Sequence, residues 1–455
     1  MRTLRTLTLL LVSWLMVGCA GADKRDQVLD DLRPVEAQFA PPARPDEPAE
    51  FDGTLDTYVG YGLSQSPALR ASLERWRSTA LMVTGQGRLP MPNVSWGYFL
   101  RSVETRVGPQ QQRIAFSQMI PWPSKLPAAE DVQVEKALAA HSELEASTLE
   151  LRERVGAVYW QLWAIQRRRE VLAEQLELVR LLIGGLQARV EVGRGEIADL
   201  TQLELTAARM EDGLLGLDQR ERGTTARLLG TIGAPPASRA PVTAARDQPV
   251  ELPAEPVAAL VSQALAHPSL TRFDHLQASA RARESKAAAS RYPDFSVGVE
   301  WVVTAEAVDT GHGIPDDSGK DAVMARVGLD VPIWQGSWSD EEASARAEQT
   351  GLAWSRTSAE QGLEADLRAT LFAIEDTVRR VRLYERTLIP QAEGALGSTQ
   401  GAFETGKGGV ANILLAYRDL IELQLGWIDA MTEHKTLWNH LDAIAGKTVT
   451  RQDAP

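Results

Sequence analysis

The stretch FSVGVEWVV at residues 295–303 decides the fold class of this 455-residue chain. Every second residue from Phe295 to Val303 is apolar, and Ser296, Gly298 and Glu300 stand between the first of them. A period of two places alternate side chains on opposite faces of a β-strand. The stretch VMARVGLDV at 323–331 alternates in the same way. We therefore predict strands at about 294–303 and 322–332, each with one apolar and one polar face.

The first half of the chain carries the same pattern at residues 93–103, NVSWGYFLRSV, 201 residues earlier. A weaker fourth strand is predicted at about 113–121. Matched prolines, Pro67 and Pro268, share the offset of 201, whereas Gly233 and Gly446 are 213 apart. Because few offsets relate so many positions, we interpret the chain as two tandem copies of one unit. The offset first changes at the Asp- and Gly-rich stretch 309–321, which has the composition of a loop.

A seven-residue apolar repeat follows the first strand pair. One heptad position holds Val155, Leu162, Leu176, Ile183 and Val190. This repeat predicts a helix over 124–192, about 100 Å long, that coils against a neighbour. Its counterpart is predicted over 338–405, with Pro390 kinking it. Shorter helices are expected at 63–88 and 196–229.

Each predicted strand is long enough to cross a bilayer when tilted, and one of its faces is apolar. A soluble, half-buried sheet would show the same alternation. If the strands do lie in lipid, four of them cannot close a barrel, because the smallest membrane barrels have about eight. The predicted fold class is thus mainly α with a membrane β-barrel portion, to which each chain contributes four strands.

The domain organisation begins with an export signal at 1–18, in which Arg2 and Arg5 precede an apolar core. Cys19 follows Gly18 in a stretch that resembles a lipobox, so we predict lipidation at Cys19. An anchor and linker at 19–60 then leads to the first repeat, at 61–235. A linker at 236–260, the second repeat at 261–446 and a tail at 447–455 complete the chain.

Charge and motif content argue against nucleic-acid binding and catalysis. The net charge of −13 repels phosphate groups, so no nucleic-acid partner is expected. Residues 401–408 lack the final Ser/Thr of a phosphate-binding loop. The six histidines include no i, i+4 pair. We predict no enzyme activity, no cofactor and no metal site, although His312 and the aspartates around it leave open a weak cation site as an alternative to a solvated loop.

A family resemblance rests on the glycines that end the long helices and on the prolines that end the strand pairs. The motif runs from Gly193 to Leu200 and from Gly406 to Leu414, with Phe403 three residues before Gly406. Pro121 and Pro332 close the strand pairs. Over nearly its whole mature length the chain resembles the TolC-like outer membrane factors. Residues 119–126 further resemble the lipoproteins that partner heavy-metal efflux pumps.

This resemblance implies a homotrimer with a twelve-stranded barrel and a helical periplasmic tunnel, lipid-anchored in the bacterial outer membrane. A periplasmic adaptor and an inner-membrane pump would be its partners, and transport would be passive conduction. The implied adaptor contacts lie at the two helical tips. They are Gly193, Arg194, Gly195, Gly406, Lys407 and Gly408.

The resemblance also implies a gate close to these tips. Its candidate residues are Asp199, Asn412 and Glu196, and three copies of Asp199 would form an acidic ring whose like charges raise their own pKa. Leu415 replaces the second acidic residue usual in the family. Asp199 is explained equally well as an ordinary residue of the first helical turn, where its negative charge interacts favourably with the positive end of the helix dipole.

Two other functions remain open from the sequence. A type I protein secretion outlet would use the same architecture with a different pump. A periplasmic coiled-coil scaffold lipoprotein would explain the heptads and Cys19, although four alternating strands have no role in it.

Overall fold

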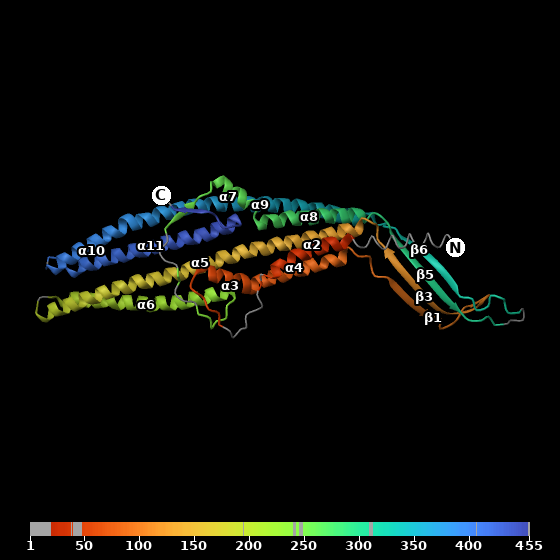
Figure 1. Cartoon of the computed structure of the whole chain (residues 1–455), viewed down its shortest axis with the longest axis horizontal. Helices are drawn as coiled ribbons and strands as arrows, with labels where there is room; N and C mark the ends of the chain where they lie inside the picture. Colours follow the sequence, from red (N-terminus) through yellow and green to blue (C-terminus); the bar gives the residue numbers. More distant parts are fainter. Residues whose placement is uncertain are drawn as a thin grey trace. The chain divides into compact units, whose positions relative to one another are not determined.

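The computed structural model describes residues 20–37, 39, 48–193, 195–239, 243–244, 249–308, 313–405 and 407–453. The predicted signal peptide 1–18, Cys19, Arg194, Gly406 and residues 309–312 lie outside the described residues. Helices and strands follow one another in nearly the same order in the two halves of the chain (Figure 1).

The first half contains α2 (Ala20–Glu36), α3 (Leu55–Gln65), α4 (Pro67–Gln86), β1 (Asn93–Tyr98), β2 (Glu104–Thr105), β3 (Gly108–Ile120), α5 (Lys125–Glu191) and α6 (Ile197–Ile232). The second half contains β4 (Glu251–Pro253), α7 (Val257–Ala264), α8 (Pro268–Ala289), β5 (Asp294–Thr304), β6 (Ala322–Asp330), α9 (Gln335–Leu383), the π-helical turn η2 (Tyr384–Leu388), α10 (Ile389–Glu404), α11 (Val410–Ala445) and β7 (Arg451–Asp453).

The chain forms two compact units, each built from both halves. Among the described residues, the strand unit takes in those up to Pro34, Arg75–His141 and Arg272–Arg356. The helical unit comprises Val35–Glu74, Ser142–Thr271 and Thr357–Pro455. The two sequence copies are therefore interleaved in space, because each unit takes elements from both of them.

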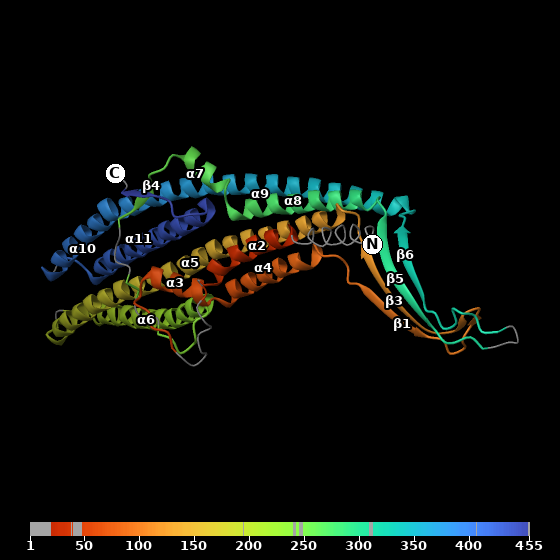
Figure 2. The ribbon, with the colours of Figure 1, turned by 45° about the vertical axis from the view of Figure 1, so that its right-hand side comes forward.

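The strands of the strand unit form one antiparallel sheet in the order β1-β3-β5-β6, with β2 paired to the start of β3 (Figures 1 and 2). The predicted strand at 93–103 is wrong in length, because the ladder with β3 ends at Tyr98. β3 starts five residues before the predicted 113, at Gly108. Its first residues, GPQQQ, carry no apolar alternation, so no local pattern indicates a strand there.

Three helices of the strand unit pack against one another. Val28 of α2 is buried against Ala80 of α4 and Ala137 of α5. The Trp76 and His141 rings lie 4.4 Å apart between α4 and α5. Helix α2 lies within the segment that was predicted as an anchor and linker. That prediction missed the helix, because the apolar pattern of this segment is too short to indicate one.

The single helix predicted at 63–88 is wrong, since the structure has α3 and α4 with a break at Ser66. Pro67 opens α4, and a proline suits the first turn of a helix because its missing N–H would have no partner there. Pro268 opens α8 after α7 in the same way. Near the first break, Gly233 ends α6 with φ 74°, and an added Cβ would lie 2.6 Å from Cδ of Pro67.

The long helix α5 agrees with the prediction of 124–192, and its heptad residues form its buried side. Leu176, Val179 and Leu186 pack with Leu203 and Met210 of α6. Arg169 interrupts the heptad because its guanidinium pairs with Glu221 at 2.8 Å and Asp218 at 3.4 Å on α6.

The second long helix differs from the first at Pro390, as predicted. Proline has no N–H for the carbonyl four residues back, and its ring crowds that carbonyl. The helix widens into η2 immediately before Pro390, and Ile389 N donates to Tyr384 O. α5 continues as an α-helix through the matching residue, Glu177.

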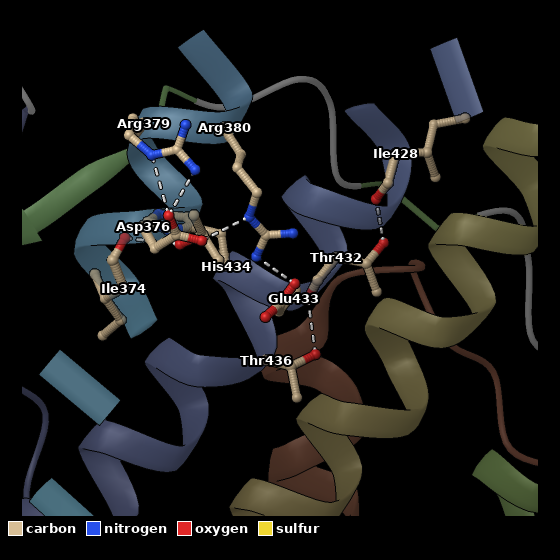
Figure 3. A network of polar contacts seen from close by, with 10 residues as sticks. Ile374, Asp376, Arg379, Arg380, Ile428, Thr432, Glu433, His434 and Thr436 are labelled. Carbon is tan, nitrogen blue, oxygen red and sulfur yellow. Dashed lines mark hydrogen bonds and ion pairs between the residues drawn. The ribbon is translucent and has the colours of Figure 1, made fainter. Parts of the chain in front are cut away.

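A network of polar contacts joins α9 to α11 in the helical unit (Figure 3). The Arg380 guanidinium bonds Asp376 at 2.9 Å and Glu433 at 2.6 Å. The neighbouring His434 is fully buried, and its Nε2 accepts from Glu251 N and Trp438 Nε1, both at 3.2 Å. Nδ1 therefore carries the proton and donates to Thr377 Oγ1 at 3.0 Å.

Burial, together with the charges of Lys435 and Arg451, lowers the pKa of His434 to about 3. A neutral His434 holds strand β4 against α11 through its bond from Glu251 N. β4 in turn pairs with β7. Segments predicted as a linker and a tail thus form a small sheet. Leu252 of β4 packs against the core of the helical unit, whereas Arg451 and Gln452 of β7 are exposed.

We expect Gly233→Ala to lower the free energy of unfolding by about 2 kcal/mol, because the new Cβ would meet Pro67 in a strained left-handed backbone. Gly230→Ala is the matched control: it lies inside α6, an added Cβ there meets no heavy atom within 4 Å, and the change should stabilise by about 0.5 kcal/mol. Urea unfolding of detergent-solubilised protein, followed by circular dichroism, measures both. Equal midpoints for the two variants would contradict the expectation.

Candidate functional site: a two-faced sheet and two helical tips

One face of the β1-β3-β5-β6 sheet is apolar and open to its surroundings. The register places Val94, Phe116 and Val299 in one row across three strands. Trp96, Ile114, Trp301 and Val323 form the next row. Exposed large apolar side chains on this face are Val94, Trp96, Tyr98, Ile114, Phe116, Phe295, Val297, Val299, Trp301, Val323, Val327 and Leu329. A patch of this extent marks a surface that contacts lipid or another protein.

The opposite face is polar and lined mostly by small residues. Ser95, Ala115 and Glu300 share one row, and Ser117, Gly298 and Arg326 share another. Glu300 is the most buried residue of this face, with 3% of its surface exposed; Val302 is buried beside it, and the apolar Met119 and Met324 share the same face. A sheet with one apolar and one polar, small-residue face matches the wall of a membrane barrel, whose strands alternate between lipid and lumen.

Strands β1 and β6 form the two edges of this sheet, and each has a single strand neighbour among the described residues. An open edge exposes unpaired backbone N–H and C=O groups, which lipid cannot satisfy. The sheet can therefore sit in a bilayer only if further strands continue it at both edges.

An aromatic cluster marks the point where β3 passes into α5. Trp122 stacks on Tyr292 with ring centroids 4.8 Å apart. Asp294 Oδ1 accepts from Trp122 N at 2.8 Å and from Lys125 Nζ at 2.7 Å. The start of β5 is thus tied to the end of β3. Trp334 follows β6 and is 76% exposed.

The first helical tip joins α5 to α6. Gly193 N donates to Val190 O at 3.0 Å and ends α5 with φ 72°. Glu196 is exposed and precedes α6 without capping it through its side chain. Asp199 lies half-exposed in the first turn of α6. Gly195 packs beside Val190, since an added Cβ would lie 2.9 Å from Val190 Cγ2.

The second tip joins α10 to α11. Ala402 O accepts from Lys407 N at 2.8 Å and from Gly408 N at 3.1 Å, which closes the end of α10. The Lys407 side chain is exposed. Asn412 is also exposed, in the first turn of α11, and its N–H donates to Gly409 O at 3.2 Å. The structure therefore places Asp199 and Asn412 at equivalent positions, just past each tip.

Arg189 of α5 connects the first helical hairpin to the second, and the sequence did not reveal this residue. Its guanidinium donates to Phe403 O at 3.3 Å and to Glu404 O at 3.1 Å, at the carboxyl end of α10. It also lies 4.8 Å from the centroid of the Phe403 ring. A cation at this end of a helix is favoured by the helix dipole. An arginine near a tip carries no sequence signal for a partner more than two hundred residues away.

Two aspartates of the acidic loop after β5 accept hydrogen bonds from other residues of the chain. Asp321 accepts from Trp301 Nε1 at 2.7 Å and from Thr304 N at 2.9 Å. Asp317 accepts from Arg106 NH1 at 2.9 Å. The described residues contain no group of three or more His, Cys, Asp and Glu residues arranged to hold a metal ion. Within the described part of the chain, no helix combines the length and apolar character needed to cross a bilayer.

Solved protein structures share this architecture, although no sequence match accompanies them. No protein-family profile matches the chain, and no curated protein matches it by sequence. The outer membrane protein VceC from Vibrio cholerae superposes with a TM-score of 0.70 at 18% identity, covering 86% of this chain and 96% of VceC.

The chain has the fold of a TolC-like outer membrane factor. CusC, whose structures describe transmembrane channel formation, covers 90% of this chain and 98% of its own, with a TM-score of 0.71 and 14% identity. The open-state MtrE outer membrane channel from Neisseria gonorrhoeae covers 88% and 91%, with a TM-score of 0.68 and 15% identity. This outer membrane factor fold thus accounts for nearly the whole described chain.

Proposed function

We propose that the chain is the outer-membrane channel component of a tripartite efflux system and conducts substrates passively to the exterior. The observation that carries this proposal is the four-stranded sheet, with an exposed apolar face, a polar face and two open edges. Likeness to outer membrane channels over about nine-tenths of the chain supports it.

The oligomer follows from the open edges. Three chains would supply twelve strands, and joining β1 of one copy to β6 of the next would pair every edge. A homotrimer also suits the family resemblance of the sequence. A coiled-coil scaffold lipoprotein gives this sheet no role, whereas a type I secretion outlet would share the whole architecture and differ only in its pump.

Lipid anchoring at Cys19 completes this proposal. Helix α2 begins at Ala20, directly after Cys19, and its Val28 is buried against α4 and α5 in the strand unit. An acyl chain on Cys19 would therefore be attached close in sequence to the unit that carries the proposed barrel strands.

The function is tested by isolating the protein from outer membranes. We expect heat-modifiable trimers with an acylated N-terminal cysteine by mass spectrometry, and ion conductance after reconstitution into planar bilayers. Trimers without any conductance would favour the scaffold, and loss of pump-dependent resistance on deletion would separate efflux from protein secretion.

The entrance of the channel is proposed to lie at the helical tips, where Arg189 holds the two hairpins together. Asp199 would face the entrance as a threefold acidic ring, with Glu196 and Asn412 beside it. Leu415, 56% exposed, stands where the family has its second acidic residue, so the ring would hold one carboxylate per chain.

Arg189→Ala is expected to raise the open probability of the reconstituted channel roughly tenfold, because a charged hydrogen bond contributes about 1.5 kcal/mol. Arg180→Ala is the control, since Arg180 pairs with Glu177 and Glu211 inside the first hairpin alone.

Asp199→Ala should weaken block of the reconstituted channel by divalent cations, because it removes the proposed acidic ring. Unchanged conductance and block in both test variants would remove the proposed gate.

Adaptor contact is proposed at the tips, through Gly193, Arg194, Gly195, Gly406, Lys407 and Gly408. Reversing the charge of Arg194 and Lys407 together is expected to abolish pump-dependent resistance while trimers still assemble. Full resistance in this double variant would place the adaptor contact elsewhere.

A further inference from the structure

Three charged side chains meet on the polar face of the sheet, and we call them the Arg113–Glu300–Arg326 triad. Arg113 contacts Glu300 through two nitrogens of its guanidinium: Nε lies 2.6 Å from Oε1 and NH2 lies 2.8 Å from Oε2. Arg326 NH2 lies 2.5 Å from Oε2. The three residues come from β3, β5 and β6, so the sheet register itself brings them together.

The triad exposes its cations and hides its anion. The Glu300 side chain is 4% exposed, whereas those of Arg113 and Arg326 are 43% and 53% exposed. Two guanidinium groups against one carboxylate leave a net charge of +1 per chain. A solute on this face therefore meets guanidinium N–H donors, which suit carboxylate, phosphate and other oxyanions.

The surroundings of the triad make the arginines the most prominent polar groups on this part of the face. Neighbouring positions on the same face are mostly short, whereas Met324, which lies opposite Glu300 on β6, is 44% exposed. The short neighbours are Ser95, Gly97, Ala115, Ser117, Ser296, Gly298 and Gly328. The acidic residues Asp294 and Asp330 lie opposite each other in the register of β5 and β6, at the far end of that ladder. The Asp294 carboxylate forms an ion pair with Lys125 Nζ at 2.7 Å.

We propose that the Arg113–Glu300–Arg326 triad forms a basic ring in the barrel lumen that favours small anions over cations. This inference rests on the proposed trimeric channel, because the polar face becomes a lumen only when the barrel closes. Three copies would place six arginines and three glutamates at one level, with a net charge of +3. Rings of charged side chains set ion selectivity in pores, and a low-dielectric wall strengthens their field.

The ring distinguishes between substrate classes. Anionic solutes would be concentrated at the triad, and free metal cations would be repelled there. The acidic ring proposed for Asp199 would act at a separate position, so the two rings contribute independently to the measured selectivity.

The test is the reversal potential of the reconstituted channel under a gradient of KCl. Arg113→Gln with Arg326→Gln is expected to lower the chloride-to-potassium permeability ratio roughly two- to fivefold, as the removal of six screened charges predicts. Glu300→Gln should raise the same ratio. Arg106→Gln is the matched control, because Arg106 pairs with Asp317 in a loop outside the strand ladder and should leave the ratio unchanged.

Arg326→Gln alone serves if the double variant does not assemble, because the two-pronged Arg113–Glu300 contact remains and the ratio should still fall. A wild-type protein that forms no conducting channel would overturn the proposed function. Channels that conduct normally but keep the wild-type ratio in Arg326→Gln and Glu300→Gln would overturn the basic ring and leave the channel function standing.

Discussion

Strands β1 and β6 each present a row of backbone N–H and C=O groups that no other strand of the described chain pairs. A buried polar backbone group without a partner is costly, and lipid offers none. This constraint links the other features of the strand unit. In the proposed assembly the apolar face lies against lipid. Because lipid cannot bond the backbone groups of an open strand edge, both edges must be paired, and further copies of the chain supply the strands that pair them.

The internal duplication supplies the means to meet this constraint. β3 from the first copy and β5 from the second pair over ten positions, so the sheet is continuous only because both copies contribute to it. Asp294 secures the same junction by accepting from Trp122 N and Lys125 Nζ. In the helical unit, Val410 of α11 is buried among residues of α5 and α6, and Arg189 contacts the end of α10. Both the sheet and the contacts around the helical tips therefore need residues from both copies.

The long helices of the two copies differ in structure. α5 is a single helix of 67 residues, whereas its counterpart is divided by η2 before Pro390. Tyr384 in η2 packs closely on Gly426 of α11, where an added Cβ would lie 2.6 Å from the tyrosine oxygen, and Glu385 accepts from Trp427 Nε1 at 2.9 Å. A π turn held to its neighbour in this way is a defined feature of the second hairpin, and α5 has no counterpart to it.

The sequence by itself determined the four main strands, the long helix of each copy and the order in which they follow one another. Alternation at 295–303 predicted β5, which runs from Asp294 to Thr304, and the heptad predicted α5 to within a residue at each end. These patterns are local, since burial of one face of a strand or helix selects residues at fixed spacing. Only the tertiary structure decided the cross-strand triad at Glu300, the Arg189 contact, the buried His434 and the β4–β7 pair. Each of these depends on residues brought together from distant parts of the chain, and the spacing of residues along a sequence carries no record of such contacts.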